Sequence, residues 1–147
     1  MSDKKKILIV DDEADVRFGY HVLLAANHYD TFFAPDASSA VAEAHTHKPD
    51  LIILDLGLPV EPRSEDTVPL SEPDGGYLVM DRLRADKHLA LIPVIIVSGR
   101  DPYANRGRAL REGAMAFVQK PWEPDKLLAI IGQLVGSPVP SISQPNA

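Results

Sequence analysis

Short apolar runs alternate with longer amphipathic segments along this chain. Each run has the length of a strand and is nearly unbroken in apolar character, which is typical of parallel strands buried on both faces. The segments between the runs place apolar residues at a helical spacing. The expected strands comprise residues 6–10, 31–34, 51–54, 92–97 and 116–119, and the expected helices comprise residues 12–27, 37–47, 75–86, 102–111 and 125–135.

Local signals mark the ends of several of these helices. Acidic residues from Asp12 to Asp15 suit the first turn of a helix, because they interact favourably with the helix dipole. Asp36 is placed to cap the second helix, and Gly113 is placed to end the fourth. Five β-α units with crossovers of this length predict an α/β fold, in which helices cover both faces of a parallel sheet.

Polar residues whose side chains can bind ions or react follow the ends of four of the strands. Asp11 and Asp12 follow the first strand, Asp55 follows the third, Ser98 follows the fourth and Lys120 follows the fifth. Parallel strands present their carboxyl ends at one edge of the sheet, where open α/β folds build their sites. We therefore expect three carboxylates, a hydroxyl and an ammonium around one point.

Such a cluster needs positive charge. Carboxylates a few ångströms apart cannot all stay ionised unless a cation joins them. A hard divalent ion such as Mg2+ prefers oxygen ligands, and the Lys120 ammonium adds a second positive group. This combination favours a site that binds and transfers a phosphoryl group.

Composition removes several other classes of protein. The 147 residues suit one domain, and 15 basic against 21 acidic residues give a net charge of −6. The only basic run, residues 4–6, leads into the first strand, so nucleic-acid binding by this segment is disfavoured. The absence of cysteine excludes disulfides and thiolate metal sites and fits a cytoplasmic location. A polar amino terminus and strand-length apolar runs indicate neither a signal peptide nor a membrane helix.

Two stretches depart from the regular alternation. Residues 136–147 hold three prolines and three serines without any charge, so we expect a flexible tail or linker. A long loop, about residues 56–74, directly follows the third-strand aspartate. Compact α/β folds usually need only ~2–6 residues for such a connection. The loop is therefore a candidate for contact with the site or with a partner.

The strand-end motifs resemble those of a response-regulator receiver domain. They are Asp11-Asp12, Asp55-Leu56-Gly57-Leu58-Pro59, Ser98-Gly99 and Lys120-Pro121, in the order of that family. The resemblance implies a flavodoxin-like sheet with strand order 2-1-3-4-5 and five helices, formed by residues 1–135. It also implies that the chain accepts a phosphoryl group from a histidine kinase or a phosphotransfer protein.

The resemblance assigns roles to individual carboxylates. Asp55 matches the phosphoacceptor, which forms a covalent acyl phosphate. Asp12 and Asp55 would coordinate Mg2+ directly, with Asp11 contributing through a water molecule and Gly57 through its backbone carbonyl. The chain would then be a signalling protein that slowly removes its own phosphoryl group, and not a conventional enzyme.

The resemblance also assigns the groups that respond to phosphorylation. Lys120 would neutralise phosphoryl charge and Ser98 would donate a hydrogen bond to a phosphoryl oxygen. Phe117 matches the aromatic switch residue of the family, and it is expected to belong to the core as well. The bond between Lys120 and Pro121 is expected to be cis.

Partners follow from the same resemblance. A downstream protein, or an output domain beyond this sequence, would recognise the phosphorylated state. A homodimer is also compatible with the family. Neither nucleic acid nor a membrane is an expected direct partner. Residues 60–73 insert fourteen positions where receivers have a short connection.

One alternative stays open. A pseudo-receiver would use the same fold as a protein-interaction module without being phosphorylated, although the acidic and lysine positions are all present here. A dehalogenase-type phosphatase would need an aspartate where Gly57 stands. The acidic residues after the first strand would repel the cofactor phosphate of a flavodoxin-like carrier, and no P-loop motif occurs.

Overall fold

A five-stranded parallel sheet forms the centre of the molecule. The computed structural model describes residues 4–61 and 74–136 of the chain. Within them the strand order is β2-β1-β3-β4-β5, which confirms the predicted flavodoxin-like fold. The strands are β1 (Lys6–Val10), β2 (Asp30–Ala34), β3 (Leu51–Asp55), β4 (Val94–Ser98) and β5 (Ala116–Gln119).

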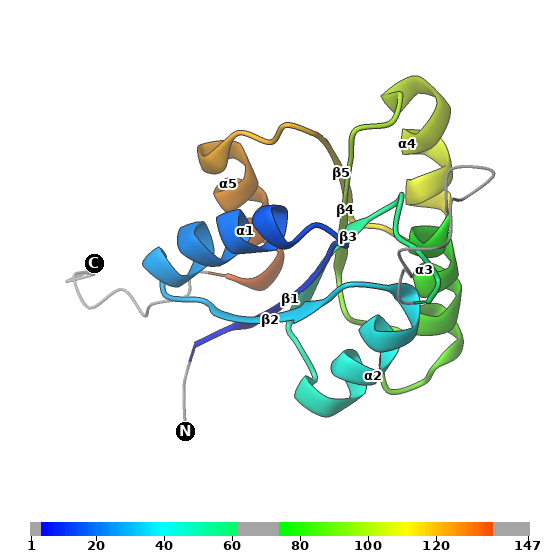
Figure 1. Cartoon of the computed structure of the whole chain (residues 1–147), viewed down its shortest axis with the longest axis horizontal. Coiled ribbons are helices and arrows are strands. Elements are labelled where there is room, and N and C mark those ends of the chain that lie inside the picture. The colour runs from blue at the N-terminus through cyan, green and yellow to red at the C-terminus, as the bar shows by residue number, and fades with distance from the viewer. Residues whose placement is uncertain (1–3, 62–73, 137–147) are drawn as a thin grey trace.

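Helices cover both faces of this sheet (Figure 1). One face carries α1 (Ala14–Ala26) and α5 (Pro124–Val135), and the other carries α2 (Ala37–His47), α3 (Gly75–Ala85) and α4 (Pro102–Arg111). Alternate residues of each central strand serve the two layers. In β1, for example, Ile7 and Ile9 pack toward α1 and α5, while Leu8 and Val10 pack toward the other helices. The unbroken apolar character of the strands is therefore explained by burial on both sides.

Several local features predicted from the sequence are confirmed. The Asp36 carboxylate accepts a hydrogen bond from the Ser39 backbone N–H at 2.8 Å and so caps α2. Gly113 follows α4 with a φ of 107°, a left-handed value that favours glycine. The peptide bond between Lys120 and Pro121 is cis, as expected.

Other ends differ from the prediction by a few residues. The first helix begins at Ala14 and not at Asp12, because Glu13 is extended and donates its backbone N–H to the Asp11 carboxylate at 3.0 Å. The fourth strand begins at Val94, because Ile92 donates its N–H to Leu89 in a preceding turn and Pro93 has no N–H.

The long connection after β3 is held at both of its described ends. Pro59 and Val60 accept backbone hydrogen bonds from the first turn of α2, at 2.9 and 3.0 Å. On the return, Gly75 donates its N–H to the Leu58 carbonyl at 2.8 Å, and a side chain at this glycine would collide with that carbonyl oxygen. Residues 62–73 of the predicted insert (60–73) and residues 137–147 of the predicted tail (136–147) lie outside the described residues, so the domain boundaries stay predictions.

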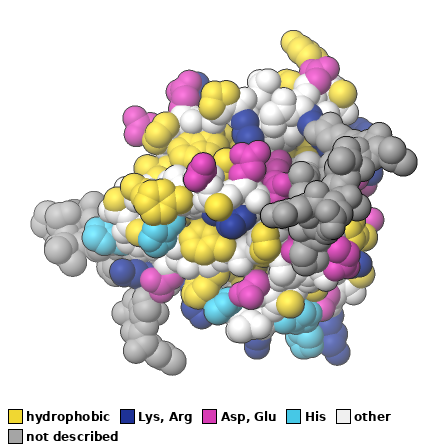
Figure 2. Space-filling model, viewed as in Figure 1, with side chains coloured by type: hydrophobic (Ala, Val, Ile, Leu, Met, Phe, Trp, Pro, Cys, Tyr) yellow, Lys and Arg dark blue, Asp and Glu magenta, His cyan; other side chains and the backbone are white. Residues whose placement is uncertain are grey.

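Among the described helices, none has the length and apolar character needed to cross a membrane. Basic side chains are scattered over the face shown in Figure 2 and form no continuous patch there.

Candidate functional site

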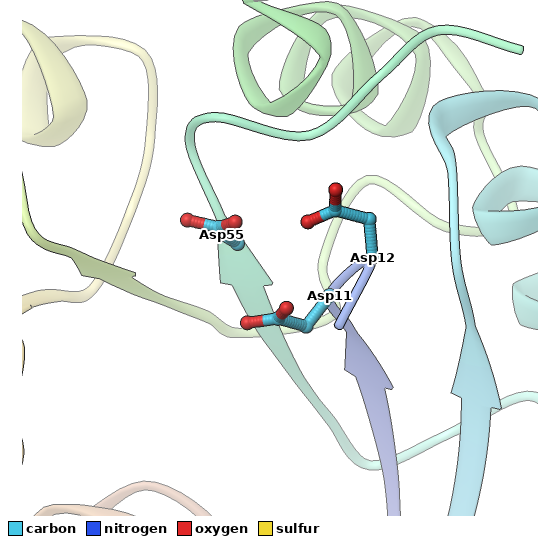
Figure 3. A group of neighbouring side chains, drawn as sticks. All are labelled: Asp11, Asp12 and Asp55. Carbon is cyan, nitrogen blue, oxygen red and sulfur yellow. The ribbon is translucent and has the colours of Figure 1, made fainter. Parts of the chain in front are cut away.

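Three carboxylates meet at the carboxyl edge of the central strands (Figure 3). Asp55 is the last residue of β3, and Asp11 follows directly after β1, which pairs with β3 through Val10 and Leu54. One carboxylate oxygen from each of Asp11, Asp12 and Asp55 lies within 4.8 Å of the others. The parallel register thus brings together residues that are distant in the sequence.

Asp11 forms the buried floor of this cluster. Only 2% of its surface is exposed. Its Oδ1 accepts the backbone N–H of Glu13 at 3.0 Å, and its Oδ2 accepts a hydrogen bond from the Lys120 ammonium at 3.0 Å. Arg17 donates to the Asp11 backbone carbonyl at 2.7 Å. Both the side chain and the backbone of Asp11 are therefore held in place by α1 and Lys120.

Lys120 connects the carboxylates to the far side of the site. Its Nζ lies 3.0 Å from Asp11 and 3.5 Å from Asp55. Its backbone N–H donates to the Ser98 carbonyl at 2.8 Å, which extends the β4–β5 pairing by one residue. The ammonium therefore occupies the position from which it can meet negative charge on either carboxylate.

These contacts change the acidity of both partners. Burial raises the pKa of Asp55 above its ordinary value; Lys120 opposes this change, while Asp11 and Asp12 add to it through charge repulsion. Burial on its own would lower the pKa of Lys120, but the charges and hydrogen bonds of Asp55 and Asp11 outweigh it, and this pKa is raised. The ammonium stays protonated, and the Asp55 carboxylate is destabilised in the absence of a further cation.

Ser98 and Gly99 line the adjacent strand end. Ser98 is 1% exposed and stands one position beyond Val97, the β4 residue that is paired with Asp55. Its Oγ accepts the backbone N–H of Arg100 at 3.0 Å. A Cβ added at Gly99 would meet no atom within 4 Å, so there is open space beside this residue.

Phe117 belongs to the core in this structure. It is 7% exposed and belongs to the apolar cluster between the sheet and helices α2, α3 and α4. The expected core role is therefore confirmed, while its role as a switch stays a prediction.

Two contacts near the site were not anticipated from the sequence. The Arg100 guanidinium pairs with Asp74 at 2.6 Å and so joins the β4–α4 loop to the start of α3. Tyr20 of α1 stacks on Trp122 with ring centroids 4.9 Å apart. The aromatic residue two positions after Lys120 was a visible signal for the second contact, whereas nothing in the sequence pairs Arg100 with Asp74.

The donor set fits a hard divalent cation. Carboxylate oxygens are ligands that Mg2+ prefers, and neither histidine nor cysteine takes part in the cluster of acidic residues found among the described positions. Gly57 reaches the same place through its backbone, since its N–H donates to Asp55 Oδ1 at 3.4 Å. The site therefore brings together Asp11, Asp12, Asp55 and Lys120, with Gly57 adjacent.

Comparison with known proteins agrees with this geometry. Residues 7–132 match the model of the response regulator receiver domain family. The chain belongs to this family, whose members serve two-component signalling.

The relatives include transcriptional regulators. The phosphate regulon regulator PhoB of Pseudomonas aeruginosa is 33% identical over 125 residues, which cover 85% of this chain and 49% of PhoB. The chain spans about half the length of the curated relatives it matches. It covers 53% of the response regulator Rre1 of Synechocystis and 46% of PhoP of Bacillus subtilis.

Solved structures support the fold. The chemotaxis response regulator CheY4 of Vibrio cholerae superposes with a TM-score of 0.74 at 23% identity, covering 89% of this chain and 98% of CheY4. The BeF3-activated receiver domain of Klebsiella pneumoniae RstA gives a TM-score of 0.75 at 24% identity, covering 89% and 98% of the two chains.

Proposed function

We propose that this receiver accepts a phosphoryl group on Asp55, in a Mg2+-dependent reaction, from a histidine kinase or a phosphotransfer protein. The observation that carries this proposal is the position of the Asp55 carboxylate, which lies 3.5 Å from the Lys120 ammonium within a cluster of three carboxylates. A nucleophile, a cation-binding set of oxygens and a fixed ammonium are the groups that phosphoryl transfer requires.

The Asp55 carboxylate acts as the nucleophile. One of its oxygens attacks the phosphorus of a phosphohistidine, the phosphorus–nitrogen bond breaks, and the histidine nitrogen keeps the bonding electrons and regains a proton. The product is an acyl phosphate on Asp55. Lys120 then exchanges its contact with Asp55 for a phosphoryl oxygen, and Ser98 turns its hydroxyl from Arg100 toward another.

Mg2+ would be held by Asp12, Asp55 and the Gly57 carbonyl, with Asp11 acting through water. The last assignment is supported by the hydrogen bonds that both oxygens of Asp11 already accept. When bound, the cation neutralises carboxylate and phosphoryl charge so that two anions can approach each other. Gly57 and Gly99 offer no side chains to shield the acyl phosphate, so water can reach it and the protein can lose its phosphoryl group by hydrolysis.

The phosphorylated state would be read by a downstream protein or by an output domain. The second possibility is supported by the length of the relatives, about twice that of the matched region. We expect residues 1–135 to form the receiver, to act in the cytoplasm and to bind no nucleic acid directly, in keeping with the net charge of −6.

Phosphorylation with small donors tests the proposal. The chain should gain one phosphoryl group from acetyl phosphate with Mg2+, measured by intact mass, and Asp55→Asn should gain none. EDTA should stop the reaction. Modification that persists in Asp55→Asn, or proceeds unchanged with EDTA, would contradict the assignment, and a parent chain that takes up nothing would favour the pseudo-receiver.

Thermal unfolding of Asp12→Ala separates metal binding from phosphorylation. At [Mg2+] about a hundredfold above Kd the parent should gain about 2.7 kcal/mol of stability. The variant should gain nothing, while its stability without Mg2+ should not fall, because one repelling carboxylate has been removed. A full gain in Asp12→Ala would locate the cation elsewhere.

A further inference from the structure

An aromatic pair joins the segment that follows Lys120 to α1. Trp122 follows Lys120 and the cis-linked Pro121, and its indole stacks on the ring of Tyr20 with centroids 4.9 Å apart and ring planes inclined by 28°. Tyr20 is 1% exposed, so its ring is a fixed surface. Trp122 is half-buried and packs against the same apolar cluster beneath α1 and α5.

Lys120 is thereby held from two sides through its backbone. On one side its N–H donates to the Ser98 carbonyl of β4 at 2.8 Å. On the other side the chain is fixed two residues later, where Trp122 meets α1. The long, flexible side chain of a lysine gains a defined position only if the backbone that carries it is fixed.

The same helix fixes the partner of Lys120. Asp11 is bound by the residue that precedes α1, through the Glu13 N–H at 3.0 Å, and by α1 itself, through the Arg17 guanidinium at 2.7 Å. One turn further on, α1 supplies Tyr20. This helix is therefore a common support for the carboxylate and the ammonium, which are separated by 109 positions in the sequence.

The environment of the tyrosine hydroxyl agrees with this proximity. Burial raises the pKa of Tyr20 strongly, the charge of Asp11 raises it further, and the neighbouring Trp122 acts in the opposite direction. Tyr20 therefore stays neutral, and its hydroxyl lies within the electrostatic influence of the acidic cluster.

We propose that Tyr20 and Trp122 are positioning residues for phosphoryl transfer, which fix the Lys120 ammonium between Asp11 and Asp55. This inference rests on the proposed function for its kinetic consequence, but the placement of Lys120 can be measured without phosphorylation. Neither aromatic residue is expected to touch the phosphoryl group.

NMR of the lysine ammonium groups tests the placement directly. In the parent, the Lys120 Nζ signal should differ from those of solvent-exposed lysines, because the group is held between two carboxylates. Tyr20→Leu and Trp122→Leu should move this signal toward the exposed lysines, whereas Tyr20→Phe, which keeps the stack, should not. An unchanged Lys120 signal in both leucine variants would overturn the proposal.

The rate of uptake from acetyl phosphate tests the consequence. Small displacements of a catalytic group reduce rates strongly, and we expect Tyr20→Leu to slow uptake about tenfold. Tyr20→Phe should stay close to the parent. In a Lys120→Ala background, Tyr20→Leu should have no further effect, because its action passes through the ammonium that has been removed. An undiminished loss in that background would overturn the proposal.

Tyr29→Leu is the matched control. Tyr29 is 4% exposed and belongs to the same apolar cluster, but it precedes β2 at the opposite edge of the sheet. Compared at equal folded fraction, it should leave both the Lys120 signal and the uptake rate unchanged. An equal loss in Tyr29→Leu would mean that Tyr20 is only a core residue. If the parent takes up no phosphoryl group, the proposed function fails, and the NMR comparison still decides the positioning role.

Discussion

At the residue scale, three carboxylates of the site repel one another, and the Lys120 ammonium attracts two of them, Asp11 and Asp55. Asp55 lies among carboxylates in a partly buried place, and Lys120 compensates only part of the cost, since it is closer to Asp11 (3.0 Å) than to Asp55 (3.5 Å). The raised pKa of Asp55 is the sum of these effects. Without a bound cation the protein is therefore less stable when Asp55 is ionised, so the role proposed for Asp55 is at odds with the stability of the fold.

Asp55→Asn should stabilise the Mg2+-free protein at neutral pH. A carboxyl group whose pKa is raised in the folded state adds to the stability of the protein at pH values below its ordinary pKa of 3.8. This added stability is lost as the pH rises through the folded-state pKa. The amide avoids that loss. We expect a melting temperature a few degrees higher at pH 7, shrinking to no difference near pH 3, measured by calorimetry in EDTA.

Asp81→Asn supplies the control for this comparison, because it removes an exposed carboxylate of α3 that lies outside the acidic cluster found in the described chain. It should change the melting temperature little at either pH. A gain of the same size in Asp81→Asn would indicate a general effect of net charge.

At the element scale, the loop between β4 and α4 is tied to the start of α3. Arg100 donates its backbone N–H to Ser98 Oγ at 3.0 Å, and its guanidinium pairs with Asp74 at 2.6 Å. Further along, the Arg108 guanidinium lies 3.6 Å from the centre of the Tyr77 ring, which joins α4 to α3. If phosphorylation draws Ser98 away from the Arg100 N–H, the loop has to give up this hydrogen bond, so we expect these contacts to favour the unphosphorylated arrangement.

Asp74→Asn should therefore favour the phosphorylated arrangement. The Asp74 side chain is 60% exposed, and pairs of this kind contribute at most about 1 kcal/mol, which corresponds to a gain of about two- to fivefold in affinity for beryllofluoride with Mg2+. Titration followed by NMR measures this affinity. Asp81→Asn again controls for net charge, and an unchanged or weaker affinity in Asp74→Asn would show that the pair does not restrain the loop.

At the scale of the whole molecule, the proposed phosphorylation of Asp55 would have to change a surface that a partner can contact. Phe117 is already buried, while Tyr103 at the start of α4 is 98% exposed. A partner is expected to read the surface around Tyr103, Arg106, Arg111 and Phe117, to which the buried Phe117 would contribute through packing and not through direct contact. Moving such a two-state element from mostly off to mostly on requires roughly 5 kcal/mol of differential binding, which a phosphoryl group with up to about two negative charges can supply.

Hydrogen exchange with and without beryllofluoride tests this expectation. Protection should change in peptides that cover residues 98–117, because the β4–α4 loop and β5 respond to the new charge. A change confined to residues 56–73 would mean that the long loop after β3 communicates the signal and that Phe117 is only a core residue.

The fold was predictable because its signals are local. Unbroken apolar runs reveal strands buried on both faces, and the carboxyl ends of such strands must share one edge of the sheet. The strand-end positions of Asp11, Asp12, Asp55 and Lys120 were therefore enough to place these four residues in one site. The Asp36 cap and the Gly113 turn were predictable for the same reason, since each depends on neighbouring residues only.

The tertiary structure alone decided the contacts between residues that are far apart in the chain. The preference of Lys120 for Asp11, the pairing of Arg100 with Asp74 and the stacking of Tyr20 on Trp122 depend on the distances between elements and on side-chain rotamers. Periodicity carries no information on either. The sequence by itself therefore determined which groups form the site, and the packing of α1, α3 and the loops determined how firmly each group is held.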